Sequence, residues 1–269
     1  MDYEDLIKSI DDRTRMIILC SPHNPVGRVW EKEELRKLGE ICIKNNILIL
    51  SDEIHSDLVF RGYKHTPLAS ISEEFAQKSL TFVAPSKTFN VAGLKTSIAI
   101  IPNNDLRNKY NAMIENLGLH SNNIFGIEAM EAAYNHGEEW LEQVIDYIYD
   151  NYLFLKEYFK QNIPELKVIE PEGTFLVWVD FSRLGLSDNE LNNLIMNWAQ
   201  LAFDEGKIFG DEGKCYQRIN IATQRKTLQT ALANPEATAA ALNITSSDVT
   251  SLFTWGNFFT VNLIPVTIG

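Results

Sequence analysis

Cysteines are scarce in this sequence, and basic residues are fewer than acidic ones. The three cysteines, Cys20, Cys42 and Cys215, are widely spaced and form no C-x-x-C pair, which argues against a zinc finger or a disulfide framework and fits a reducing, cytoplasmic setting. The chain has 24 Lys and Arg against 36 Asp and Glu, a net charge of -12. Because no local basic cluster offsets this charge, nucleic acid is not an expected partner.

Export and metal-binding signals are also missing. The amino terminus begins with an acidic segment, Asp2 to Asp5, and lacks the basic and then apolar order of a signal peptide. Neither an H-E-x-x-H motif nor an EF-hand loop occurs, so no metal is expected. The 269 residues, 45% of them hydrophobic and 22% charged, are typical of a soluble globular protein of one or two domains.

The first part of the chain has the pattern of a parallel α/β sheet. The apolar run 16–20 predicts a buried strand, and the prolines and glycine of 22–27 predict a rigid loop after it. Residues 31–45 have apolar side chains at helical spacing, and 47–50 predict the next strand. A strand, helix and strand in this order place a ligand site at the carboxyl ends of the strands.

An acidic segment follows the second predicted strand. Asp52, Glu53 and Asp57 lie close to His55 in this segment. One interpretation is a solvated acidic turn. The other is a catalytic carboxylate, because α/β enzymes keep reactive groups at the carboxyl ends of their strands.

A lysine follows the next apolar run, 80–84. Lys87 lies in the segment 84–95, which also contains Gly93 and Lys95. Burial would lower the pKa of such an amine and make it a nucleophile suited to Schiff-base chemistry. The alternative is an ordinary solvated lysine in a turn.

The second part of the chain predicts a long helix and then a smaller α+β domain. Helices are expected over 105–117, 124–134, from 138 onward and over 188–202, with Ser187 as a cap, and strands over 166–169, 175–179 and 217–222. Arg218 alternates with apolar neighbours in the last strand. It is expected either to bind a substrate carboxylate or to form a surface ion pair.

Three ordered motifs resemble the fold-type I pyridoxal-phosphate enzymes, specifically the cystathionine β-lyase (C–S lyase) branch of the class I/II aminotransferases. They are Pro-His-Asn-Pro-Val-Gly-Arg-Val-Trp at 22–30, Ser-Asp-Glu-Ile-His-Ser-Asp at 51–57, and Ala-Pro-Ser-Lys-Thr-Phe-Asn-Val-Ala-Gly-Leu at 84–94. The segments 171–175 and 217–222 extend the resemblance. It implies part of a large domain over 1–140, mainly a parallel sheet with helices on both faces, and a small α+β domain over 141–232.

The resemblance also implies roles for particular residues. Lys87 would hold pyridoxal 5'-phosphate covalently and then act as general base, and Asp52 would pair with the pyridine nitrogen. Asn24 would donate to the phenolic oxygen of the cofactor, near which His55 also stands. Ser86 and Lys95 are candidates for the phosphate, although Ala84 and Lys95 replace the hydroxyl and arginine that are commoner in the family. Arg218 would bind the substrate carboxylate.

The implied reaction is β-elimination from a small sulfur-containing amino acid such as cystathionine, giving pyruvate, ammonia and a thiol. An aminotransferase of the same family and a non-catalytic remnant or regulatory protein are the alternatives. A homodimer is implied for a complete family member. Relative to the family, the amino-terminal region before the asparagine motif is expected to be missing, and activity of the chain by itself is therefore in doubt.

The sequence changes character near residue 230. After Lys226 there is no lysine or arginine, and residues 251–269 are uncharged. Residues 233–269 resemble a fragment of the formate/nitrite transporter family, which suggests a tail of different origin. Membrane contact is expected only through this tail, with a buried pair of helices as the alternative.

Overall fold

The apolar runs of the first part form a four-stranded sheet. The computed structural model describes residues 1–119 and 123–233. The strands lie in the order β1 (Met16–Cys20), β2 (Leu48–Asp52), β3 (Ser79–Val83) and β4 (Ile98–Ile100). β1 and β2 are parallel, as are β2 and β3, whereas β4 is antiparallel to β3. The predicted strand-helix-strand unit and the mainly parallel sheet are confirmed, with an antiparallel strand at the edge.

The helix α2 (Lys32–Lys44) covers one face of this sheet. Glu31 and Glu34 form a capping box that satisfies backbone donors at its start. The helix buries Leu35, Leu38 and Cys42 against strand residues of the same core, and the short helix α3 (Glu73–Gln77) adds Phe75 to that core. On the opposite face, Tyr110 of α5 (Asn104–Asn116) contacts Phe82, while Ile18 stays 71% exposed.

The remaining helices of this part lie close to their predicted positions. Asn103 caps α5, and Asn123 caps α6. Asp2 caps the helix at the amino terminus, Tyr3–Ser9, by accepting from the backbone N–H of Asp5. The other elements of this part are α1 (Tyr3–Ser9), α6 (Ile124–His136) and three short helical turns that the sequence did not predict, η1 (Leu68–Ser70), α4 (Pro85–Thr88) and η2 (Ala92–Leu94).

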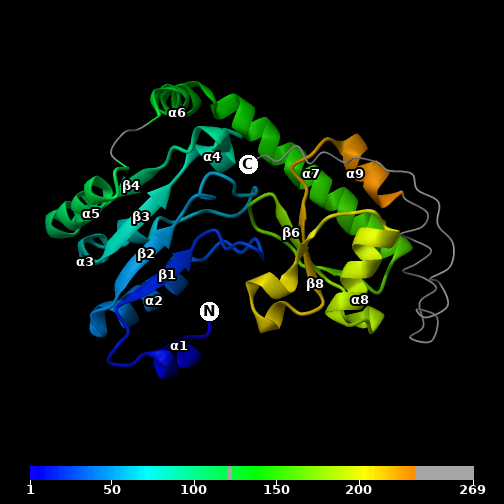
Figure 1. Ribbon diagram of the computed structural model, residues 1–269, viewed down its shortest axis with the longest axis horizontal. Coiled ribbons are helices and arrows are strands. Elements are labelled where there is room, and N and C mark those ends of the chain that lie inside the picture. Colours follow the sequence, from blue (N-terminus) through cyan, green and yellow to red (C-terminus); the bar gives the residue numbers. More distant parts are fainter. Residues whose placement is uncertain (120–122, 234–269) are drawn as a thin grey trace.

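The long helix α7 (Glu138–Asn162) runs from the first sheet to the second lobe of the molecule (Figure 1). Its buried residues Ile148, Tyr152, Leu155 and Phe159 belong to the second hydrophobic core. That core also takes in Leu58 and Phe60, which follow β2, so the two parts share packing. The helix therefore links the two lobes along the chain, and its buried face packs into the core that they share.

The second lobe is built on an antiparallel sheet. Its strands lie in the order β5 (Lys167–Val168), β6 (Leu176–Asp180), β8 (Tyr216–Asn220) and β7 (Asp204–Glu205). The predicted cap at Ser187 is confirmed, but α8 (Asp188–Asn193) is shorter than predicted and continues as a π-helical turn, η4 (Leu194–Trp198). The remaining elements are η3 (Ser182–Leu184), η5 (Gly206–Phe209), η6 (Asp211–Gly213) and α9 (Arg225–Leu232).

The predicted division at residues 140 and 232 stays a prediction. The interpretation of the tail lies outside the described residues, apart from residue 233. Within residues 1–119 and 123–233, no helix combines the length and the apolar character that crossing a membrane requires.

A fully buried asparagine joins α7 to the segment after β8. The Nδ2 group of Asn151 donates to the carbonyl oxygens of Ile221 (2.9 Å) and Thr223 (2.8 Å), and its Oδ1 accepts from Nε of Arg225 (2.7 Å). We expect Asn151→Leu to lower the free energy of unfolding by about 2–4 kcal/mol, because it leaves buried polar groups unpaired. Urea unfolding measures this. Asn162→Ala at the end of α7 is the control, and an equal loss in both variants would contradict the assignment.

Candidate active site

The candidate residues of the first lobe gather where its parallel strands end. Cys20 of β1 lies beside Asp52 of β2, and Asp52 lies beside Phe82 of β3. Lys87 follows β3 directly, in the helical turn α4. Its side chain is half-buried, and among the described residues its Nζ forms no hydrogen bond or ion pair. The predicted lysine is therefore neither fully solvated nor held by a structural partner.

Asp52 is a half-buried carboxylate at the last position of β2. Its Oδ1 accepts a long hydrogen bond from the backbone N–H of Ile54 (3.3 Å). Burial raises the pKa of Asp52, while this N–H and the positive charge of Lys87 oppose the rise. Because burial penalises an unpaired carboxylate, Asp52 is suited to a cationic partner.

His55 is buried and keeps one ring nitrogen unpaired. Its side chain is 3% exposed, and its Nδ1 has no hydrogen-bond partner within the described part of the chain. The ring lies edge-on to Phe175, 5.5 Å between centroids. Burial lowers the pKa of His55 to about 4, and the charges of Lys87 and Arg218 act in the same direction. The imidazole is therefore neutral at physiological pH and lies in the field of both cations.

Arg218 connects the small lobe with the loop that carries Asn24. Its Nη1 donates to Oδ1 of Asn24 (2.7 Å), and its Nε and Nη2 both donate to Oδ2 of Asp204 (2.9 and 2.7 Å). Because a guanidinium group only donates, this contact fixes the amide oxygen of Asn24 toward Arg218 and leaves the Nδ2 group for another acceptor. Of the two predicted roles for Arg218, the ion pair is present, with Asp204 as the partner. Arg218 also donates one hydrogen bond to Asn24.

The two phosphate candidates differ in their surroundings. Ser86 is half-buried, one position before Lys87, and Lys95 is exposed in a left-handed conformation (φ 51°) after η2. Neither side chain has a hydrogen-bond or ion-pair partner within the described ranges. Nδ2 of Asn123 donates to the carbonyl of Leu94 (3.0 Å), so the start of α6 anchors the backbone beside Lys95.

The acidic segment after β2 is not a solvated turn. Glu53 is 1% exposed and accepts from Ser51 (2.8 Å) and from the backbone of Leu68 (3.1 Å), and its other oxygen lies 2.8 Å from Nε2 of His65. Asp57 accepts from the hydroxyl of Thr88 (2.8 Å). The carboxylates beside Asp52 thus have structural roles, and the second one fixes the helical turn that carries Lys87.

Sequence reasoning did not identify Glu172 as a site residue. Its Oε2 accepts from Nη1 of Arg28 (2.5 Å) and from the backbone of Val29 (2.7 Å). The backbone N–H groups of Glu172 and Gly173 donate to the carbonyl of Gly27 (2.8 and 3.1 Å). These bonds fasten the loop of Asn24 to the segment 171–174. The only sequence signal was the motif Pro-Glu-Gly-Thr, and this motif does not indicate which residue Glu172 contacts.

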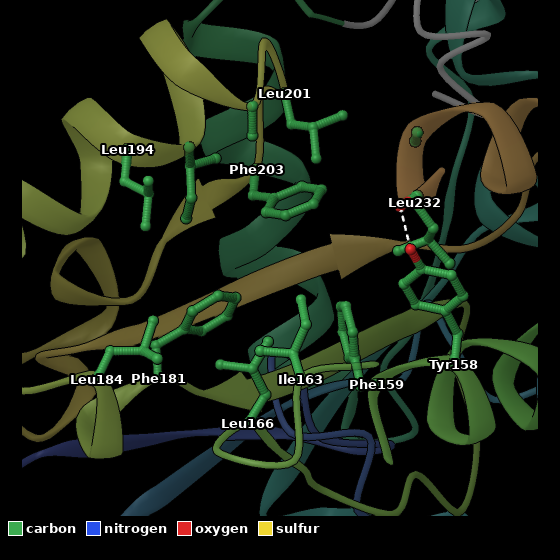
Figure 2. Close-up of a pocket in the computed structure, with 13 residues that line it drawn as sticks. Tyr158, Phe159, Ile163, Leu166, Phe181, Leu184, Leu194, Leu201, Phe203 and Leu232 are labelled. Carbon is green, nitrogen blue, oxygen red and sulfur yellow. Dashed lines mark hydrogen bonds between the residues drawn. The ribbon is translucent and has the colours of Figure 1, made fainter. Parts of the chain in front are cut away.

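A small apolar cavity lies elsewhere, in the second lobe between α7, η4 and α9. Figure 2 shows its walls, where the hydroxyl of Tyr158 donates to the carbonyl of Leu232. The cavity measures about 60 Å³ and has no charged side chain in its lining. It cannot solvate an anion, so it is separate from the candidate site. In residues 1–119 and 123–233, no group of His, Cys, Asp and Glu is arranged to bind a metal.

Comparison with known families supports the resemblance seen in the motifs. The family described as "Aminotransferase class I and II" matches residues 1–234. The chain belongs to this family. The match ends before most of the tail and gives no support to the transporter resemblance of residues 233–269.

Relatives of this class I and II aminotransferase chain include named lyases. Cystathionine beta-lyase PatB of Bacillus subtilis (strain 168) is 42% identical over 238 residues, which are 88% of this chain and 62% of the relative. The structure of cystalysin from Treponema denticola, which contains a pyridoxal 5'-phosphate cofactor, matches with a TM-score of 0.85 and 39% identity over 90% of this chain and 62% of that one. The pyridoxal-phosphate-bound C–S lyase from Staphylococcus hominis matches with 0.81 and 31%, over 90% and 63%.

The chain therefore spans less than two thirds of the length of these relatives. The fold comparisons confirm the predicted partial α/β architecture of this family. That the unmatched part lies upstream of the asparagine motif stays a prediction.

The buried His55 predicts a loss of stability in mild acid. Its pKa is about 4 in the folded chain and has the ordinary value of 6.5 when unfolded. As pH falls from about 6.5 to 4, the unfolded state binds a proton that the folded state does not, which lowers the free energy of unfolding by up to about 3 kcal/mol. Below pH 4 this contribution levels off. Urea unfolding at pH 7 and 4.5 measures it.

His55→Gln should remove this part of the pH dependence, because glutamine does not titrate. His136→Gln, at the exposed end of α6, is the matched control and should retain it. An unchanged pH dependence in His55→Gln would show that His55 is not the group responsible.

Proposed function

We propose that this chain carries part of the site of a pyridoxal-phosphate-dependent carbon–sulfur β-lyase. The observation that carries the proposal is that the charge of Lys87 acts on both Asp52 and His55, and that Arg218, which also acts on His55, donates to Asn24. The lyase names of the relatives support the same reaction. For a substrate R–S–CH2–CH(NH3⁺)–COO⁻, water enters, the bond between sulfur and the β-carbon breaks, and the products are R–SH, pyruvate and ammonium.

The residues present fit the proposed cofactor. Asp52 is a half-buried carboxylate that has no cationic hydrogen-bond partner in the described part of the chain, which suits a protonated ring nitrogen. Nδ2 of Asn24 and the ring of His55 have donor or acceptor capacity to spare beside it. When bound, pyridoxal phosphate supplies an electron sink for a carbanion at the substrate α-carbon.

The protein groups then have separate tasks. Lys87 would hold the cofactor through its amine and would take the proton from the α-carbon of the substrate. Arg218 binds the substrate carboxylate with the donors that Asp204 and Asn24 leave. Ser86 and Lys95 are proposed for the phosphate, supported by the lack of other partners for their side chains in residues 1–119 and 123–233.

The proposal also covers the substrate, the oligomeric state and the cellular compartment of the whole protein. Its substrate is a small sulfur-containing amino acid, and it acts as a homodimer in the cytoplasm. The unpaired thiols of Cys20, Cys42 and Cys215 support a reducing compartment.

Covalent labelling at Lys87 tests the proposal. The full chain is mixed with pyridoxal phosphate, reduced with borohydride and digested, and the labelled peptide is identified by mass spectrometry. We expect the label on Lys87 and its loss in Lys87→Ala, because Lys87 is the half-buried amine of the site, whereas Lys95, the other lysine among the site residues, is exposed. Lys78→Ala, whose amine contacts Asn46 on the surface, is the control and should keep the label. A label that persists in Lys87→Ala would contradict the assignment.

Product analysis separates the reactions. L-cystathionine is added to the loaded protein, and release of pyruvate with a free thiol supports the lyase. Transfer of the amino group to a keto acid, without thiol release, would instead support an aminotransferase. Labelling of Lys87 without either product would support a non-catalytic remnant.

A further inference from the structure

Asp204 is placed beside Arg218 by the backbone of the second sheet. β7 and β8 are antiparallel, and Asp204 lies directly opposite Arg218 in their register. Both Nε and Nη2 of Arg218 donate to the same oxygen, Oδ2 of Asp204. The arginine side chain is 18% exposed and the aspartate 46%. The contact is therefore partly open to solvent on the aspartate side.

The donors of Arg218 can be counted. A guanidinium group carries five N–H bonds, one on Nε and two on each terminal nitrogen. Asp204 takes the one on Nε and one on Nη2, and Asn24 takes one on Nη1. One N–H therefore remains on each terminal nitrogen, with no further acceptor among the described residues. The remaining N–H on Nη2 lies on the end-on edge of the group, because the other one shares an acceptor with Nε, and a carboxylate oxygen can accept from it there.

An aromatic group restrains the guanidinium plane as well. The ring of Phe209 lies 4.8 Å from the guanidinium carbon of Arg218. Phe209 packs edge-on against Trp178 (5.5 Å between centroids), and Trp178 stacks on Tyr216 (5.2 Å). A cation over an aromatic face is attracted to it. The ring of Phe209 therefore restrains one face of the Arg218 guanidinium group, while Asp204 binds its Nε edge.

We propose that Asp204 is the positioning residue for the substrate carboxylate. It takes up the Nε edge of Arg218 and so presents the end-on N–H of Nη2 to the ligand. This rests on the proposed role of Arg218 in the lyase site. Without Asp204 the long side chain regains rotamer freedom, and ordering it again weakens carboxylate binding. The substrate class this selects is an amino acid whose free α-carboxylate lies end-on to the arginine.

The Nε–H resonance of Arg218 tests the proposal directly. The full chain is labelled with ¹⁵N-arginine, and L-alanine, which has no leaving group, is titrated with and without pyridoxal phosphate. We expect the resonance to shift with L-alanine, and Asp204→Asn to raise the dissociation constant about tenfold or more, because one charge-assisted contact is lost. Asp146→Asn is the matched control: Asp146 accepts from Nε and Nη2 of Arg61 (2.7 and 2.6 Å) outside the site, and affinity should not change.

Three results would overturn the proposal. They are an unchanged affinity in Asp204→Asn, an equal loss in Asp146→Asn, and an Arg218 resonance that does not respond to L-alanine. If Asp204→Asn fails to fold, Asp204→Glu keeps the charge but moves it by one methylene, and it should weaken binding less than tenfold but measurably. An unchanged affinity there also overturns the proposal.

The same samples keep this proposal apart from the lyase assignment. Absence of label at Lys87 in the unaltered chain defeats the lyase, whereas the L-alanine titration without cofactor still reports on Arg218. Normal labelling at Lys87 with an unaffected titration in Asp204→Asn defeats only the role of Asp204.

Discussion

The parallel register of β1, β2 and β3 is the constraint on which the site depends. It sets Cys20 beside Asp52 and Asp52 beside Phe82, so the loops that leave these strands emerge at one edge of the sheet. The Asn24 loop follows β1, His55 follows β2, and Lys87 follows β3. A parallel sheet needs a crossover between successive strands, and α2 provides it on the face where Leu35 and Leu38 are buried. The positions of the candidate site residues at this edge of the sheet therefore depend on the packing of α2 against the strands.

The second lobe completes the edge through a small number of polar contacts. Glu172 fastens the Asn24 loop through Arg28 and Val29, and a side chain at Gly27 would come within 2.8 Å of Pro171. Because the loop and the segment 171–174 are in such close contact, a shift of one moves the other. Arg218 then spans from β8 to Asn24. Arg218, the proposed carboxylate-binding residue, and Asn24, the proposed cofactor donor, therefore belong to one hydrogen-bond network.

Much of this could be predicted from the sequence, because apolar runs and caps are local signals. The strands 16–20 and 175–179 and the cap at Ser187 follow from short-range patterns, and the motif order led to Asn24, Asp52, Lys87 and Arg218. The partners of the charges were not predictable in the same way. Glu53 and Asp57 lie four residues apart in the same acidic segment, yet Glu53 accepts from the backbone of Leu68 and Asp57 accepts from Thr88. Likewise, Asp204 meets Arg218 only because two strands of the second sheet pair in that register.

His55 has a further consequence for how the site responds to its surroundings. With its pKa near 4, the imidazole contributes no change of charge between about pH 5 and 8. A solvated histidine at the same place would titrate within this range. The buried ring instead keeps a constant charge in the field of Lys87 and Arg218. Any pH dependence of binding or activity at this site between about pH 5 and 8 must then originate in other groups. This leaves fewer groups to which a measured pKa can be assigned.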